Sequence, residues 1–159
     1  MRITRRLALL GATAIATMTA AASPALASTE PAAGAFTEGP ETITSAQFAD
    51  GNEIYTLTRE AVFSGSYAGI GLVDQRIVIH KDGSANVQMT IDFTGTACGQ
   101  AATLTFQVAA QVDFVTNTMT GHYTVQDSGP SSQHSPRGNG TFTGVPGAGG
   151  SYEGQIHCD

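Results

Sequence analysis

The two cysteines of this chain, Cys98 and Cys158, are the residues best suited to covalent chemistry. Neither belongs to a CxxC motif, and Cys158 lies one residue before the end of the sequence, which disfavours a thiol nucleophile. An even number of cysteines in an exported chain indicates a disulfide instead. We therefore predict a bond between Cys98 and Cys158 that ties the last strand to an interior turn and stabilises the fold by roughly 4 kcal/mol.

Arg59 is the candidate ligand-binding residue. It alternates with Tyr55, Leu57, Ala61 and Phe63, and because alternate residues of a strand share one face, its guanidinium is expected to point toward the interior. A guanidinium in that place could bind an anionic ligand. Two other interpretations stay open, namely a bulge at this position or an ion pair with an acidic residue near the rim of the fold.

The histidines show no spacing that would place several metal ligands on one element. They are His80, His122, His134 and His157, and we interpret them as exposed strand or turn residues, so we predict no metal site. The sequence contains neither a G-x-S-x-G nucleophile elbow nor a phosphate-binding P-loop. Accordingly, we predict no catalytic residue and no cofactor.

The first residues of the chain have the pattern of an export signal, and the expected strands follow it. Arg2, Arg5 and Arg6 precede an apolar stretch, and residues 25–27 read Ala-Leu-Ala, which is the pattern of a cleavage site. We predict a signal peptide over 1–27 and a secreted chain, exported by the general or the twin-arginine route. Three of the seven basic residues leave with the signal, so four remain against 13 acidic ones, which disfavours a nucleic-acid partner. The apolar stretch is also too short for a membrane span.

The secreted part divides into a short lead-in and one β domain. Residues 28–39 are small, acidic and contain Pro and Gly, so we predict a flexible N-terminal segment, followed by a β domain over 40–159. In the domain, apolar residues recur at every second position, clearest over Ser84–Thr94 and Ala102–Phe114. Asp82-Gly83 is a pair favoured in primed two-residue hairpin turns, and it predicts antiparallel neighbours.

The number of alternating segments predicts the fold class. We expect about eight strands, and an open sheet of that size would leave one apolar face wet and two edges unpaired. The predicted fold is therefore all-β, a single antiparallel eight-stranded barrel that is closed or nearly closed. A two-layer β-sandwich is the alternative, because strand number and spacing fit both. The polar segment Asp127–Asn139 is expected to form a long mobile loop.

Four segments carry a resemblance to a known family. They are FSGSYAG (63–69), KDGSA (81–85), FTGTACG (93–99) and GNGTFTGVPGAGGSYEG (138–154). By their spacing, the chain resembles a small bacterial domain family of unknown function in the allene-oxide-cyclase-like barrel superfamily. The resemblance implies an eight-stranded barrel and suggests a cyclase- or isomerase-like enzyme as an alternative function, without assigning catalytic residues. The signal and the cysteine pair depart from the usual cytoplasmic relatives and favour an extracellular role.

The segment 72–79 predicts a surface that needs a cover. Its apolar residues lie on both faces of the expected strand, and Asp74 and Arg76 share one face, where we expect a local ion pair. The outer apolar residues should be covered by the segment Ile43–Phe48 or by a second copy of the protein. The protein is accordingly predicted to be a monomer or a homodimer.

These features predict a secreted barrel that acts as a non-catalytic binding or interaction module, with a small apolar ligand in the barrel mouth. A packed interior would favour this hypothesis, whereas an open cavity in which polar groups converge with Arg59 would favour the enzyme. The interior residues in question are Val87, Met89, Leu104, Phe106 and Tyr123. A surface-associated structural protein is a third hypothesis.

Overall fold

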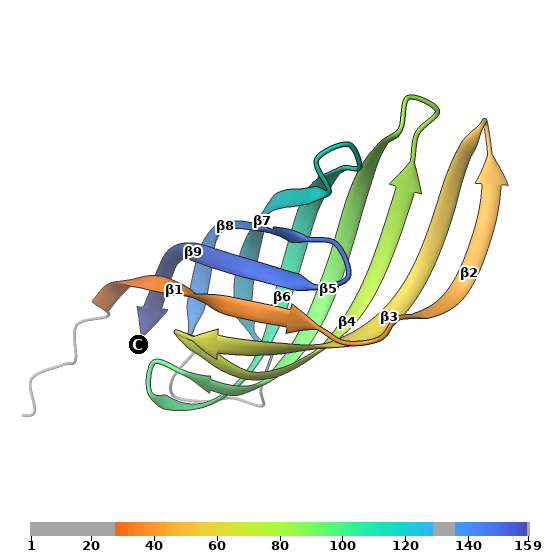
Figure 1. Cartoon of the computed structure of the whole chain (residues 1–159). Coiled ribbons are helices and arrows are strands. Elements are labelled where there is room, and N and C mark those ends of the chain that lie inside the picture. The colour runs from red at the N-terminus through yellow and green to blue at the C-terminus, as the bar shows by residue number, and fades with distance from the viewer. Residues whose placement is uncertain (1–27, 129–135, 159) are drawn as a thin grey trace, which may run out of the picture.

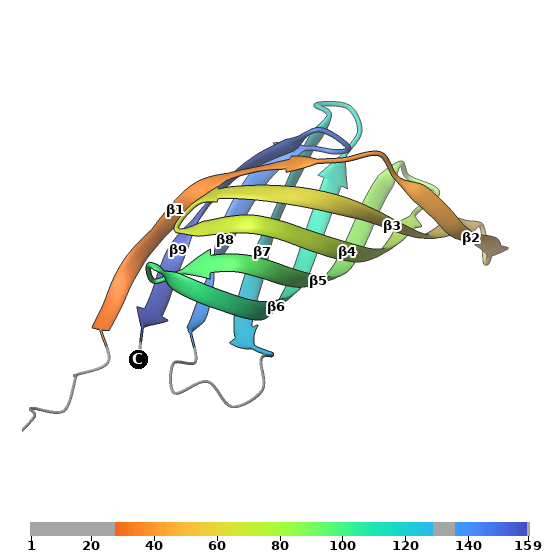
Figure 2. The same cartoon turned by 90° about the horizontal axis from the view of Figure 1, so that it is seen from below.

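The computed structural model describes residues 28–128 and 136–158, which form one antiparallel sheet of nine strands. The strands are β1 (Ser28–Glu38), β2 (Thr42–Ala49), β3 (Asn52–Gly65), β4 (Tyr67–Ile79), β5 (Ser84–Ala97), β6 (Gln100–Asp113), β7 (Thr118–Asp127), β8 (Arg137–Val145) and β9 (Gly149–Cys158). Their order is β1-β9-β8-β7-β6-β5-β4-β3-β2, and β1 also pairs with β3 (Figures 1 and 2). This pairing closes an eight-stranded barrel, which confirms the predicted fold class over the sandwich. Within the described ranges, no helix is long and apolar enough to span a membrane.

The strand β1 corrects the prediction of a flexible segment over 28–39. It pairs with β9 from Ser28 to Thr37 and with β3 from Gly34 to Glu38. The small side chains of this segment give little apolar alternation, but backbone hydrogen bonds to two neighbouring strands do not depend on side-chain size. β1 is therefore the strand that closes the barrel. The predicted signal peptide, 1–27, lies outside the described residues.

The strand β2 is the one strand of the nine that does not belong to the closed eight-stranded barrel. Among the nine described strands its one partner is β3, from Thr42↔Thr58 to Ala49↔Asn52, with a bulge between Ile43 and Ser45. β1 and β2 thus follow one another along β3, and β2 ends the sheet. In Figure 1, β2 to β6 extend beyond the hairpin that joins β8 and β9, so that this end of the barrel is open.

The β5–β6 and β4–β5 turns each contain residues with positive backbone φ angles. Cys98 and Gly99 have φ angles of 54° and 71°, and they form the two-residue turn between β5 and β6. The primed turn predicted at Asp82-Gly83 is wrong, because only Gly83 has a positive φ, at 82°. Its N–H donates to the carbonyl of His80, which gives a three-residue loop that ends in a left-handed glycine.

The predicted loop 127–139 is shorter than expected. β7 continues to Asp127 and β8 begins at Arg137, so both strands extend into the polar segment. Both ends hold because their backbones continue antiparallel ladders, Asp127 opposite Leu104 and Arg137 opposite His157. Residues 129–135, which include His134, lie outside the described part of the chain.

Aromatic side chains fill the closed part of the barrel. Neighbouring rings have centroids between 5.0 Å (Tyr67 and Phe106) and 6.5 Å (Tyr67 and Tyr123) apart. Glycines of β8 leave the room that these rings need: a Cβ atom on Gly138 would lie 2.5 Å from Tyr67 Oη, and one on Gly140 would lie 2.6 Å from Tyr123 Oη. The glycine-rich segment near the C-terminus is therefore part of the core packing.

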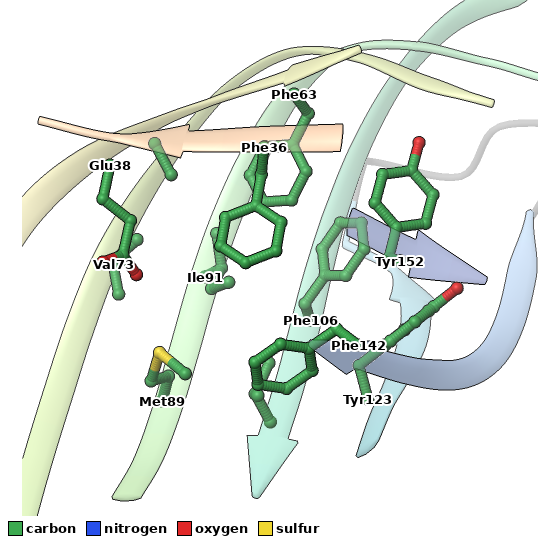
Figure 3. A pocket seen from close by; sticks show the side chains of 12 residues that line it. Phe36, Glu38, Phe63, Val73, Met89, Ile91, Phe106, Tyr123, Phe142 and Tyr152 are labelled. Carbon is green, nitrogen blue, oxygen red and sulfur yellow. The ribbon is translucent and has the colours of Figure 1, made fainter. Parts of the chain in front are cut away.

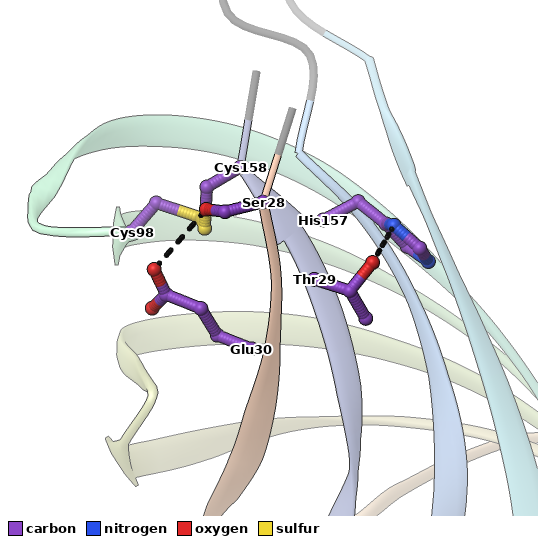
Figure 4. Close-up of a disulfide and its surroundings, with 6 residues drawn as sticks. All are labelled: Ser28, Thr29, Glu30, Cys98, His157 and Cys158. Carbon is purple, nitrogen blue, oxygen red and sulfur yellow. Dashed lines mark hydrogen bonds between the residues drawn. A yellow bond between two sulfur atoms is a disulfide. The ribbon is translucent and has the colours of Figure 1, made fainter. Parts of the chain in front are cut away.

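The cysteine pair joins the last strand to the β5–β6 turn, as predicted. Cys98 and Cys158 are 60 residues apart in sequence, their Cα atoms are 5.8 Å apart, and their sulfur atoms are bonded. Figure 4 shows this bond beside the first residues of β1. On the neighbouring strand pair, Thr29 Oγ1 lies 2.8 Å from His157 Nδ1, which adds a side-chain link between β1 and β9. The disulfide and this hydrogen bond hold together the end of the barrel opposite its open mouth.

Candidate functional site

The inner face of β3 places Arg59 inside the barrel, near its open end, where 8% of the residue is exposed. Its Nη1 atom donates to Glu38 Oε2 and its Nη2 atom to Glu41 Oε2, both at 2.8 Å. The structure thus shows the ion pair that the sequence left open as one interpretation. Two carboxylates surround one guanidinium, so the cluster carries net negative charge. Binding of an anionic ligand by Arg59 stays a prediction, and the charge of this cluster does not favour it.

Glu38 connects three parts of the barrel mouth. Besides Arg59, its Oε2 atom accepts a hydrogen bond of 2.8 Å from the N–H of Gly147, in the β8–β9 turn. Its own backbone N–H donates to the carbonyl of Ala148 at 3.0 Å. The Glu38 side chain is only 5% exposed. The residue therefore holds the end of β1, the middle of β3 and the β8–β9 turn in fixed positions.

An apolar cavity of about 40 Å³ lies next to this cluster (Figure 3). Its lining residues are Phe36, Glu38, Ala61, Phe63, Val73, Met89, Ile91, Phe106, Val108, Tyr123, Phe142 and Tyr152. In Figure 3, the hydroxyl groups of Tyr123 and Tyr152 point away from Met89, so rings and aliphatic groups face the cavity. The one carboxyl group in this lining, that of Glu38, already bonds Arg59 and Gly147. The cavity therefore suits a neutral, apolar group.

Tyr67, Tyr123 and Tyr152 lie together, the last two in the cavity lining, and their hydroxyl groups differ in hydrogen bonding. Tyr152 Oη accepts a bond from the N–H of Tyr67 and donates one to the carbonyl of Ser64, both at 2.9 Å. Within the described residues, Tyr67 Oη and Tyr123 Oη have no partner. Burial, together with the nearby Tyr152, raises the pKa of Tyr123 to about 12. Burial also raises the pKa of Tyr67 and of Tyr152.

The interior residues named from the sequence pack as predicted. Their exposed fractions are Val87 1%, Met89 6%, Leu104 0%, Phe106 3% and Tyr123 5%. A packed interior favours a binding module, and the function itself stays a prediction. The cyclase- or isomerase-like alternative required polar groups that converge with Arg59 on a cavity, and the two carboxylates that meet Arg59 are both bonded to it.

The remaining candidate residues do not gather into one site. His80 Nε2 lies 2.9 Å from Asn86 Nδ2, His157 bonds Thr29, and His122 is exposed. In the described ranges, no group of three or more His, Cys, Asp or Glu residues is placed to hold a metal ion.

The expected ion pair between Asp74 and Arg76 is wrong. Across residues 28–128 and 136–158, the salt bridges present both belong to Arg59. Both side chains are exposed, and an exposed ion pair gains too little energy to offset the entropy lost when two side chains are held in one geometry. Both charged groups are left on the outer face of β4.

Sequence reasoning missed Glu38 and Phe36, which contribute to the cavity, because both fall in the segment predicted to be flexible. Their spacing of two residues is the only signal that marks them as neighbours on one strand face. Compared with known proteins, the chain matches no family model, and no curated protein gives a significant match. The resemblance to the allene-oxide-cyclase-like barrels therefore stays a prediction.

Proposed function

We propose that this protein is a secreted, disulfide-linked barrel that binds a small neutral, apolar ligand at its mouth and does not transform it. The observation that carries the proposal is the apolar cavity beside the Glu38–Arg59 pair. Secretion rests on the signal-like residues 1–27 and is compatible with the disulfide. The resemblance to the allene-oxide-cyclase-like superfamily agrees with a barrel that holds a ligand, although the fold alone does not define an activity.

The cavity limits the size of what it can hold. A water-sized group needs roughly 10–15 Å³ of cavity volume, so the cavity of about 40 Å³ holds about three such groups. The occupant is therefore a very small apolar molecule or the end of a longer chain that leaves through the open mouth. Dispersion contacts with Phe36, Ile91 and Phe106 would supply most of the binding energy.

Xenon binding followed by NMR tests the cavity directly, because xenon enters small apolar cavities without needing polar partners. We expect shifts at Val73, Ile91 and Phe106 under xenon pressure. The variant Ala61→Leu fills the cavity and should abolish them, whereas Ala110→Leu adds the same volume at a core position outside the cavity lining and should preserve them. Native mass spectrometry of the protein from its own culture medium then reveals a retained natural ligand.

The proposal fails if xenon produces no shifts around the cavity, or if Ala61→Leu and Ala110→Leu behave alike. A retained molecule that carries a net charge would also contradict it, since the lining offers no free ionic partner. The enzyme alternative stays a prediction, and turnover of the retained molecule by the purified protein would support it.

A further inference from the structure

The outer face of β4 presents two adjacent side chains of opposite charge, with an apolar residue on each side of the pair. Along this face the sequence reads Ile70, Leu72, Asp74, Arg76 and Val78. Leu72 is 59% exposed and Ile70 is 50% exposed, and Asp74 and Arg76 are exposed beside them. Val62, opposite Ile70 on β3, is 54% exposed and enlarges the apolar end. Figure 2 faces this wall of β3, β4 and β5.

The structure removes one of the two covers that the sequence allowed for this face. The segment around Ile43–Phe48 forms β2, which pairs edge to edge with β3 and so continues the sheet without crossing the outer side of β4. A contiguous exposed apolar patch beside charged groups is typical of an interaction surface. A second copy of the protein is the occupant that remains.

We propose that the outer face of β4, with its neighbours on β3 and β5, is the interface of a reversible homodimer. A two-fold axis that crosses the strands between positions 74 and 76 stacks β4 on β4 of the partner in the opposite direction. Asp74 then faces Arg76 of the partner subunit, and Leu72 faces Val78 of the partner subunit. Because a two-fold interface is isologous, each contact occurs twice.

Charge complementarity favours this axis over the other two-fold arrangement. An axis parallel to the strands would place each Asp74 against its own copy and each Arg76 likewise, which is repulsive. With the crossing axis, both charges that lack an ion pair within the described chain gain a partner of opposite sign. Glu60 and Asp92, beside Leu72 on β3 and β5, add negative charge within reach of the partner's Arg76.

The size of the patch predicts a weak dimer. With strands about 4.8 Å apart and about 3.3 Å per residue, three strands over Leu72–Val78, the stretch that the axis maps onto itself, cover about 300 Å² on each copy. A standard stable interface buries about 800 Å² per partner, so this dimer should form only at high protein concentration. It should also weaken as salt screens the two ion pairs.

Sedimentation velocity over a concentration series that extends into the millimolar range tests the proposal with a charge exchange. Asp74→Arg and Arg76→Asp each place like charges face to face, and each should weaken association by about tenfold. The double variant Asp74→Arg/Arg76→Asp restores opposite charges across the axis and should return association to the wild-type level. Glu153→Arg, on the outer face of β9, changes net charge as much as Asp74→Arg does and should have no effect.

The three substituted positions, Asp74, Arg76 and Glu153, are exposed, and circular dichroism should show that each of the four variants keeps the barrel. A wild-type protein that stays monomeric over the whole series overturns the proposal. So does association that the single substitutions leave unchanged, which would place the contact elsewhere, for instance at the free edge of β2. Failure of the double variant to recover association would exclude the proposed axis.

Discussion

Single side chains at the barrel mouth act in ways that their type does not reveal. In the sequence, Arg59 is a candidate for binding an anionic ligand. In the fold it forms ion pairs with Glu38, at the end of β1, and with Glu41, in the segment between β1 and β2. Burial of the Arg59–Glu38 pair costs desolvation energy, and we infer that the pair serves to define one geometry. Here that geometry is the junction of β1, β3 and the β8–β9 turn.

The three core tyrosines allow a matched comparison of hydroxyl groups. Tyr123→Phe removes a buried hydroxyl that has no partner, so we expect the free energy of unfolding to rise by about 1 kcal/mol. Tyr152→Phe leaves the Tyr67 N–H and the Ser64 carbonyl without their partner, and should lower it by about 1–3 kcal/mol. Urea denaturation of both variants measures the difference. Equal effects of the two substitutions would contradict the hydrogen-bond assignment.

Among the strands, β1 was the hardest to find in the sequence and has a decisive place in the fold. Its pairing with β9 joins residues that lie at least 112 positions apart in the chain, as in Thr37↔Gly149. No pattern within a short segment can mark partners so far apart. β5 and β6 are the opposite case, since their alternation is strong and a two-residue turn connects them. Local pattern predicts such hairpins because both strands and the turn lie within one short segment.

Deletion of residues 28–38 should open the barrel. The deletion exposes the edge of β9 and the adjoining part of β3, and it removes Glu38 from Arg59. We expect the shortened chain to lose its dispersed amide NMR spectrum and to aggregate through the exposed strand edges. A chain that begins at Ser28 is the control. A soluble, well-dispersed spectrum from the shortened chain would show that the lead-in is dispensable, as its composition suggests.

The whole barrel has one end held by a disulfide, a packed aromatic core and an open mouth at the other end. The disulfide and the Thr29–His157 bond hold one end, while β2 to β6 project past the β8–β9 turn at the other (Figure 1). The proposed ligand cavity lies on the inner side of this open end, and the proposed dimer surface lies on the outer wall. Because the two sites lie on opposite sides of the sheet, ligand binding and association should be separable by mutation.

Alkaline pH should unfold the barrel in one cooperative step. The pKa of Tyr123 rises from 10.0 in the unfolded chain to about 12 in the fold, and that of Tyr67 rises as well. Below pH 10 both states keep their protons, so stability is unaffected. Above pH 10 the unfolded state loses protons that the fold retains, and the free energy of unfolding therefore falls as pH rises toward 12.

Tyrosinate absorbance and far-ultraviolet circular dichroism, recorded together, measure this transition. Tyr67, Tyr123 and Tyr152 should ionise together as the strand signal is lost, because all three lie in one core. Tyr55 lies outside that core and should ionise on its own. Ionisation of all four tyrosines near pH 10 with the strand signal intact would contradict the prediction.

From the amino-acid sequence we could predict the all-β class, the cysteine pair and most of the buried residues of β5 and β6, and we could favour a barrel over a sandwich. These properties depend on local alternation, on cysteine number and on the need to bury one face, all of which can be counted along the chain. The three-dimensional fold was needed to show that residues 28–38 close the barrel, that Glu38 and Glu41 bind Arg59, and that β2 leaves the outer wall of β4 uncovered. Each of these features depends on which strands, distant in sequence, pair with one another. The residue pattern within a single strand does not specify its partner strand.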